Sequence, residues 1–206
     1  AGQVQWTNLN PLPAPSGRRY SGAAFDVARS VVLVYGGYDG VTLGDFWSWD
    51  GGTGLWTPIN AVDPGPRYAP LLSQDVGQGN ILMFGGWDGT VARNDTWRWS
   101  GASWTVLTPA TSPTPPRHSS AMAYDSERRV VVLFGGITGS AGTASLQDTW
   151  EWDGVTWANR TPPSGSPSPP SLCAHGMAYD SVRRNVVLFG GITYPGATYR
   201  NETWKW

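Results

Sequence analysis

The chain has 206 residues and a formal net charge of −1, and at this length a chain buries about 70% of its unfolded surface. The near-neutral charge indicates neither a nucleic-acid partner nor an anionic membrane surface. No apolar run approaches the ~20 residues of a membrane span, and the single cysteine, Cys173, excludes an intrachain disulfide.

The composition is rich in glycine, proline and tryptophan, with 27, 17 and 13 residues, and helical periodicity is absent. This profile predicts an all-β protein with many turns. The first residue is Ala1 rather than Met, which suggests processing or trimming and a loss of targeting information. The compartment stays open, with a lean toward a secreted or periplasmic protein.

An apolar run that ends in two glycines occurs four times. The copies are VVLVYGG at 31–37, NILMFGG at 80–86, VVVLFGG at 130–136 and NVVLFGG at 185–191. The first glycines of successive pairs are 49, 50 and 55 residues apart. A period near fifty that is rich in aromatic and turn residues is typical of a repeat architecture.

Each repeat contains four short strand-like segments, which in the third repeat are 117–124, 130–136, 148–152 and 155–157. The Asp153-Gly154 turn joins the last two as a hairpin. The second segment is apolar at nearly every position, which predicts a strand covered on both faces. The third alternates tryptophan with polar residues, which predicts one buried and one solvated face.

The two ends of the chain suggest how the repeats close. The last repeat stops at Trp206, after its third segment, and residues 4–9 read like the missing fourth segment. Trp6-Thr7 corresponds to Trp104-Thr105 of the second repeat. We therefore expect residues 4–9 to pair with the last repeat, which would remove the exposed strand edges.

A glycine pair after an apolar strand, an aromatic third strand and a tryptophan in the fourth together resemble the Kelch repeat. The resemblance covers nearly the whole chain and implies a β-propeller of four four-stranded antiparallel blades. One domain would span residues 1–206. Its blades would lie at about 17–58, 66–107, 116–159 and 171–206, the last completed by strand 4–9. The departure is the blade number, since Kelch propellers usually have six or seven.

Two assemblies fit four repeats. A monomer needs neighbouring blades turned by about 90°, with bulky residues filling the outer wedge. Every tryptophan except Trp87 lies in a third or fourth segment, where it would fill that wedge. Local closure also favours the monomer. The alternative is a homodimer in which two chains exchange their N-terminal strands and form an eight-bladed ring.

Two columns of residues stand at the start of the first segments. One is Arg18, Arg67, Arg117 and Leu172, and the next is Arg19, Tyr68, His118 and Cys173. In a propeller both columns would surround the mouth of the central channel. Guanidinium groups gathered there would bind a small anion or an acidic peptide, and some Kelch propellers are similar in this respect. In the alternative interpretation the arginines satisfy loop carbonyls between blades.

Two sets of acids repeat with the blades. The first set, Asp26, Asp75, Asp125 and Asp180, would lie at the far end of the first segment, about 26 Å from the arginines. The second set, Asp45, Asp95, Asp148 and Glu202, precedes each tryptophan pair, and we expect it to accept hydrogen bonds from loop amides.

The loops after the glycine pairs vary in length, and function often resides in such loops. Trp87 and Tyr38 occupy matching places there, where they could stack on a glycan or anchor a protein partner. In the alternative interpretation they pack against neighbouring loops.

Catalysis finds little support in the sequence. His118, Cys173 and His175 show no metal-ligand spacing, although galactose-oxidase-like enzymes share the Kelch blade and hold copper. We therefore expect no catalytic residue, metal or cofactor. The main hypothesis is a non-enzymatic scaffold that binds a protein, an acidic peptide or a small anion at the channel mouth. The alternatives are an extracellular carbohydrate-binding module and a structural or engineered propeller fragment without a ligand.

Overall fold

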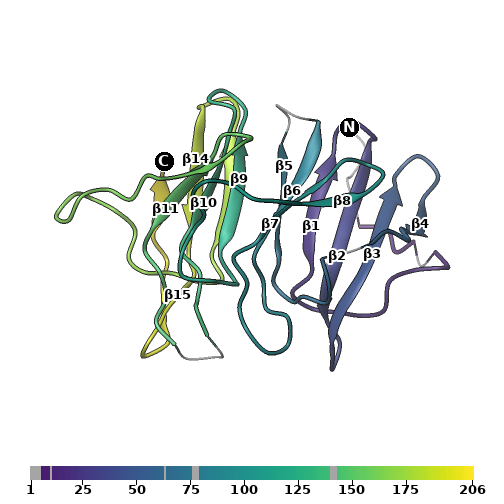
Figure 1. The fold of residues 1–206 in the computed structure, drawn as a ribbon, viewed down its shortest axis with the longest axis horizontal. Coiled ribbons are helices and arrows are strands. Elements are labelled where there is room, and N and C mark those ends of the chain that lie inside the picture. Colours follow the sequence, from purple (N-terminus) through teal and green to yellow (C-terminus); the bar gives the residue numbers. More distant parts are fainter. Residues whose placement is uncertain (1–5, 10, 63, 76–78, 140–142) are drawn as a thin grey trace.

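The fold is described by a computed structural model that covers residues 6–9, 11–62, 64–75, 79–139 and 143–206 (Figure 1). Within these ranges the chain forms strands, turns and loops, and no helix. The all-β class predicted from composition is therefore confirmed.

The strands group into four antiparallel blades. Blade 1 contains β1 (Gly22–Asp26), β2 (Val31–Tyr38), β3 (Thr42–Asp50) and β4 (Leu55–Pro58), and blade 2 contains β5 (Leu71–Asp75), β6 (Asn80–Phe84), β7 (Thr96–Trp99) and β8 (Trp104–Leu107). Blade 3 contains β9 (Ala121–Asp125), β10 (Val130–Phe134), β11 (Thr149–Trp152) and β12 (Trp157–Asn159). Blade 4 contains β13 (Gly176–Asp180), β14 (Asn185–Phe189) and β17 (Thr203–Lys205), with β15 (Ile192–Thr193) and β16 (Thr198–Tyr199) as a separate hairpin.

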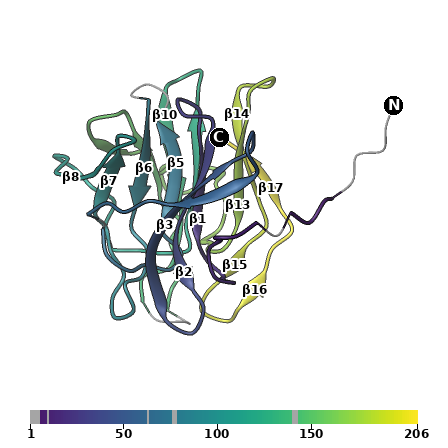
Figure 2. The ribbon, with the colours of Figure 1, turned by 90° about the vertical axis from the view of Figure 1, so that its right-hand side faces the viewer.

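The blades pack side by side through their first strands. β1 lies beside β5, β5 beside β9, and β9 beside β13. Figure 2 shows blade 1 in front, with blades 2 and 4 to either side of it. The chain is thus a four-bladed β-propeller, as the repeats predicted.

The second strands of blades 2 and 3 lie between two neighbouring blades, which explains their apolar sequence. In β10, Val131 and Leu133 pack against Phe84 of blade 2, whereas Val132 on the opposite face packs against Val186 of blade 4. Successive side chains of a strand point to opposite faces, so a strand covered on both sides needs an apolar residue at every position.

The glycine pair, which lies within β2 and directly after β6 and β10, allows the next blade to approach closely. A Cβ built on Gly135 would lie 2.4 Å from the carbonyl oxygen of Leu172 in blade 4. Gly135 also has a φ of 63°, in the left-handed region. The following amide, that of Gly136, donates to the same carbonyl at 2.8 Å. These glycines are therefore where one blade is joined to the next.

Two expected segment boundaries shift in the structure. The first segment of the third repeat was expected at 117–124, but β9 begins only at Ala121. Residues 117–120 instead run along the end of the propeller, where His118 makes a single bridge to Ile137. The fourth segment was expected at 155–157, but β12 begins at Trp157, because the preceding residues form the turn.

Closure by the N-terminal strand is not confirmed. Residues 4 and 5 of the expected strand lie outside the described residues. Residues 6–9 are described, form no strand, and leave Trp6 fully exposed. Within the described residues, β17 pairs with β14 but has no strand on its outer side.

The glycine joint generates a test of the fold. We expect Gly135→Ala to lower the free energy of unfolding by about 3 kcal/mol, because it combines left-handed strain with a backbone clash. Gly165 is the matched control: its φ is 89°, but nothing lies within 4 Å of its Cβ position. Gly165→Ala should therefore lose only about 1 kcal/mol. If urea unfolding shows equal losses of stability for the two variants, Gly135 is not a point of close contact between blades.

Candidate functional site

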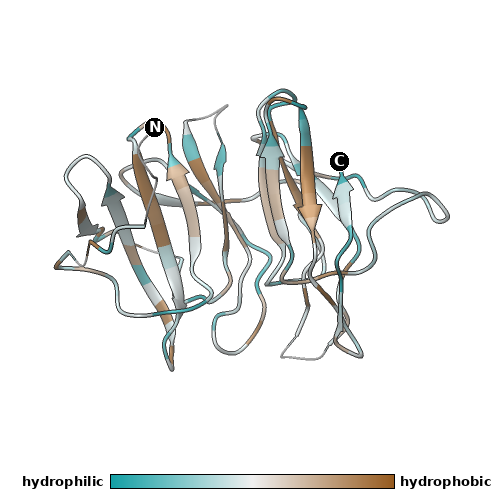
Figure 3. Ribbon diagram, turned by 180° about the vertical axis from the view of Figure 1, so that it is seen from behind, coloured by the Kyte–Doolittle hydropathy of each residue, from teal (hydrophilic) through white to brown (hydrophobic). Residues whose placement is uncertain are grey.

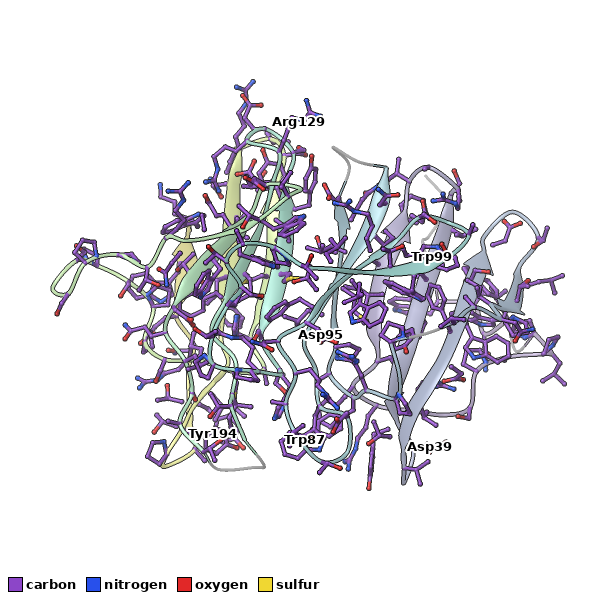
Figure 4. All side chains as sticks on the ribbon, in the orientation of Figure 1. Asp39, Trp87, Asp95, Trp99, Arg129 and Tyr194 are labelled. Atoms are coloured by element: carbon purple, nitrogen blue, oxygen red, sulfur yellow. The ribbon has the colours of Figure 1, made fainter. Side chains whose placement is uncertain are left out.

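The loops at one end of the propeller surround a cavity of about 370 Å³. Its lining comes from all four blades and includes Arg19, Tyr38, Tyr68, His118, Cys173 and Tyr194. Figure 4 places Asp39, Trp87 and Tyr194 at this end and Arg129 at the opposite end. We call this space the mouth cavity.

The second predicted column forms the rim of the mouth cavity. Arg19 pairs as a single bridge with Tyr38, and Tyr68 pairs in the same way with Trp87. The bridges His118 with Ile137 and Cys173 with Ile192 repeat the arrangement in blades 3 and 4. The matching places of Tyr38 and Trp87 in the sequence are thus matching places in space.

The residue after each member of this column has a left-handed backbone. The φ angles are 58° at Tyr20, 48° at Ala69, 53° at Ser119 and 53° at Ala174. A non-glycine residue in this region is strained by roughly 1–3 kcal/mol, so the surrounding structure must hold it. Hydrogen bonds between neighbouring blades do so, from Ala69 N to Tyr20 O at 2.7 Å and from Ala174 N to Ser119 O at 2.8 Å.

Aromatic rings cover one side of the mouth cavity. The ring of Tyr68 lies 5.8 Å from Tyr20, 6.1 Å from Tyr38 and 5.5 Å from His118, between centroids. Trp87 lies 5.5 Å from His118 in an edge contact. Trp87 thus packs against its neighbours and supports the rim, whereas Tyr38 lines the cavity itself.

Arg19 carries the available positive charge of the rim. Its side chain is exposed, and its guanidinium lies over the rings of Tyr20 at 5.4 Å and Tyr38 at 5.3 Å. Among the described residues, no carboxylate pairs with it. Two aromatic faces therefore orient a cation that an incoming anion can reach.

Neutral side chains complete the rim. Burial lowers the pKa of His118, although its hydrogen bond with the Gly139 carbonyl raises it in part. Nε2 donates to that carbonyl at 2.9 Å, so Nδ1 accepts from the Ser119 hydroxyl at 3.0 Å. Burial raises the pKa of Tyr68, which keeps its hydroxyl proton as a donor. His118 is therefore a positioning group rather than a proton carrier.

The first predicted column, the arginines one position earlier, lies beneath the rim. Arg117 is fully buried and forms a bidentate pair with Asp148, at 2.6 and 2.7 Å. Its guanidinium also donates to the carbonyls of Gly135, Thr114 and Pro115. Arg67 and Arg18 form the same pairs with Asp95 and Asp45. None of the three arginines lines the mouth cavity.

The three aspartates before the tryptophan pairs accept from side-chain donors that were not expected, and a backbone amide contributes at Asp45 and Asp95. Asp95 accepts from the Arg67 guanidinium and, at 2.7 Å, from the Trp97 indole nitrogen. Burial alone would raise the pKa of Asp95, but Arg67 and Trp97 together hold it below its usual value. The sequence contains a signal for these pairs, because blade 4 lacks the arginine, having Leu172, and also replaces the aspartate with Glu202.

Blade 4 buries a histidine beside its own glycine pair. His175 is 7% exposed, and neither ring nitrogen has a hydrogen-bond partner among the described residues. Burial lowers its pKa to about 4. The Cβ of His175 lies 2.8 Å from the Cβ position of Gly191, and its ring carbon Cε1 lies 3.4 Å from the Cβ position of Gly135 in blade 3.

Three further features of the described residues bear on function. No group of three or more His, Cys, Asp and Glu side chains could hold a metal ion there. The same residues contain no helix long and apolar enough to cross a membrane. Burial raises the pKa of the Cys173 thiol, which a hydrogen bond with Ser145 offsets in part.

The blades and the mouth cavity define a β-propeller scaffold with its variable loops at one end. The chain matches the family model of the KLHDC2/KLHL20/DRC7 Kelch-repeats domain over residues 2–191. This match spans most of the chain, so the protein belongs to the Kelch-repeat family. Kelch propellers are protein-interaction scaffolds, which sets the broad class of function.

The buried ion pairs generate a stability prediction. We expect Arg117→Met to lower the free energy of unfolding by about 3–5 kcal/mol, because it removes the guanidinium from three carbonyls and from Asp148, which keeps only the Trp150 indole as a side-chain donor. Arg183→Met is the matched control, since Arg183 pairs with Asp180 at the surface and its side chain is 77% exposed. Urea unfolding should show a nearly unchanged midpoint for this control. Similar losses in both variants would contradict a structural role for the arginine column.

His175 generates a pH prediction. Between the unfolded pKa of 6.5 and the folded pKa of about 4, the unfolded chain binds more protons, so stability falls as the pH falls. From about pH 7.5 to about pH 4.5, His175 should contribute a loss of about 2 kcal/mol. His175→Gln should lack this component in urea unfolding across that range. The difference between the two proteins removes the titration of the carboxylates, and parallel pH profiles would refute the assignment.

Proposed function

We propose that the protein binds an acidic peptide segment of a partner protein at the mouth cavity and catalyses no reaction there. The observation that carries this proposal is Arg19, an exposed guanidinium with no carboxylate partner among the described residues, at the edge of a largely aromatic cavity. A carboxylate is the group that a planar guanidinium binds best, through two parallel hydrogen bonds.

A peptide fits the rim better than a small free anion does. Tyr20 and Tyr38 flank Arg19, and apolar atoms of Ile137 and Ile192 continue the lining. An inorganic anion would need several donors converging on one point, whereas the fully buried Arg117 is already paired with Asp148. A carboxylate side chain next to apolar residues would use both the charge and the aromatic surface.

Binding rather than catalysis is also favoured by the state of the proton-transfer groups. Both ring nitrogens of His118 already have partners, Gly139 and Ser119. Asp125 sits at the far end of β9, where it pairs with Arg128. These groups therefore do not converge on a common reacting atom in the way that a nucleophilic triad does.

The proposal predicts how a peptide array should behave. Ten-residue peptides with one Glu among apolar residues should bind more tightly than the same peptides with Gln. Fluorescence polarisation of the best binder should then show about tenfold weaker affinity for Arg19→Ala, because a charged hydrogen-bonded pair is lost. Tyr38→Ala should also weaken binding, through the lost aromatic support of the guanidinium.

Arg183→Ala is the control, since this exposed arginine follows β13 at the end of that strand remote from Cys173 and the mouth cavity. It should bind the peptide as the unaltered chain does. Equal binding of Glu and Gln peptides, or no effect of Arg19→Ala, would refute the proposal. Binding of inorganic phosphate or of an oligosaccharide panel at the same cavity, in place of the peptides, would favour the small-anion or glycan alternatives.

A further inference from the structure

A second cavity lies between blade 2 and the connection that leads into it from blade 1. It measures about 410 Å³, and its lining includes Pro66 of that connection, Asp88 and Arg93 of the loop after β6, and Trp97 of β7. In the described part of the chain it shares no lining residue with the mouth cavity. We call this space the side cavity. Its volume falls within the range of about 300–1,000 Å³ that is usual for small-molecule sites.

The side cavity has a wall of mixed polarity. Figure 4 places Asp95, one of its lining residues, nearer the middle of the molecule than Trp87, which stands at the mouth end. In Figure 3 the brown, apolar residues lie along strands such as β2, whereas the loops at the mouth end mix polar and apolar residues. The lining of the side cavity follows this second pattern, with four charged side chains and one tryptophan.

Two ion pairs supply the charged groups of the wall. Asp95 pairs with Arg67, and Asp88 pairs with Arg93. The charges of the lining therefore cancel. An ionic ligand would have to break one of these pairs or bring a like charge beside it, so the wall favours a ligand without net charge.

Both ion pairs can still be reached by a polar ligand. The side chains of Asp88, Asp95 and Arg93 are 18%, 29% and 50% exposed. Arg93 uses Nε and Nη2 on the Asp88 Oδ2, and its Nη1 has no partner among the described residues. A hydroxyl can donate to a carboxylate or accept from a guanidinium, so two neighbouring hydroxyls suit an aspartate–arginine pair.

Trp97 gives the wall an aromatic surface of fixed orientation. Its indole nitrogen donates to Asp95 at 2.7 Å. Its half-buried ring packs against the core cluster between blades 1 and 2 and also lines the side cavity. The C–H face of a sugar ring can pack on such a surface while its hydroxyls stay at the edge and reach the ion pairs.

The Asp88–Arg93 pair is an addition to the repeat. The backbone carbonyl of Arg93 accepts an amide from the start of blade 3, and Leu43 and Leu146 do the same for the blades that follow them. Blades 1 and 3 thus make their joints with a leucine at this position. The joint does not need the guanidinium of Arg93, which leaves its side chain available for a ligand.

The connection into blade 2 also departs from the repeat. The Nε atoms of Arg18 and Arg117 donate to the carbonyl two residues earlier, but Arg67 Nε has no hydrogen-bond partner among the described residues. The residue two positions before Arg67 is Gly65, whose φ of 86° is left-handed and whose carbonyl accepts the Tyr35 hydroxyl. A buried donor without a partner is unfavourable. The wall of the side cavity therefore carries a polar group that its own blade leaves unsatisfied.

We propose that the side cavity binds an uncharged sugar, stacked on Trp97 and hydrogen-bonded through neighbouring hydroxyls to Asp95 and to the Asp88–Arg93 pair. This site goes beyond the peptide binding proposed at the mouth cavity and does not depend on it. Because the two cavities have different lining residues, either proposal can fail without the other.

An array of neutral and acidic oligosaccharides tests the ligand class. A neutral sugar should bind, and its methyl glycoside should bind as tightly as the matching oligosaccharide in isothermal titration calorimetry, because one sugar residue fills the site. Arg93→Leu should weaken binding about tenfold, since hydrogen bonds to a charged group are lost. Arg183→Leu is the control, because Arg183 is an exposed arginine of blade 4 that pairs with Asp180. Absence of a neutral binder, or a preference for the acidic oligosaccharides, would overturn the proposal.

Arg93→Leu introduces the residue that blades 1 and 3 already have, so we expect it to fold. Asp88→Asn is the second variant, since an amide oxygen can still accept from the backbone amides of Thr90 and Val91. It should weaken binding as well, because the pair with Arg93 loses its charge. Unchanged affinity in both variants would place the sugar elsewhere and contradict the site.

Indole signals locate the sugar in one of the two cavities. In ¹H–¹⁵N spectra the indole N–H of Trp97, assigned with Trp97→Phe, should shift when the methyl glycoside is added. The indole N–H of Trp87, which lies 5.5 Å from His118 at the rim of the mouth cavity, should not shift. A shift of Trp87 alone, or binding that Arg19→Ala abolishes and Arg93→Leu leaves intact, would place the sugar in the mouth cavity and refute the proposal.

Discussion

The propeller depends on a joint in which one arginine serves two blades. The backbone carbonyl of Arg117 accepts from Gly86 of the preceding blade, while its guanidinium binds Asp148 and the Gly135 carbonyl of its own blade. The main chain thus sets the distance between blades, and the side chain holds the blade's own glycine turn. A glycine is required where the chains meet, because a Cβ on Gly85 would lie 2.7 Å from the same carbonyl.

This joint explains why the column that begins with Arg18 has a structural role, whereas the column that begins with Arg19 lines the cavity. The arginines of the first column point inward, where their ion pairs with the aspartates hold each blade together. The next column, which begins with Arg19, follows immediately and faces the mouth cavity. A left-handed residue such as Ser119 comes directly after it and leads the chain into the first strand. A residue that stabilises the blade is thus followed directly by one that lines the cavity.

In the described part of the chain, the glycine pair of blade 4 does not make the hydrogen bond to another blade that the other three pairs make. Within the described residues, no backbone of another blade approaches Gly190, and its Cβ position meets nothing closer than 3.5 Å. A strand such as β14, apolar on both faces, leaves Phe189 exposed when one neighbour is missing.

Much of the fold could be predicted from the sequence because the same pattern of apolar, glycine and tryptophan positions occurs four times. The apolar second strand, the glycine pair at its end and the tryptophan pair of the third strand are local patterns, and they recur in the blades as the repeats predicted. The expected solvated face of the third strand is wrong for β11, where Glu151 is buried. The partner of Asp95 was not predicted, since an ion pair between residues 67 and 95 is a contact across the blade. The two columns contain a signal for this ion pair, because blade 4 lacks both the arginine and the aspartate and has Leu172 and Glu202 instead.

The sequence by itself determined the all-β class and the four blades, because strand periodicity and turns are short-range properties. Only the tertiary structure decided which arginine stays available, since burial and pairing of Arg117 but not Arg19 follow from how whole blades meet. Only the tertiary structure, likewise, separates β13 from β1, because the angle between blades is set by the volume of side chains packed between them rather than by any local pattern.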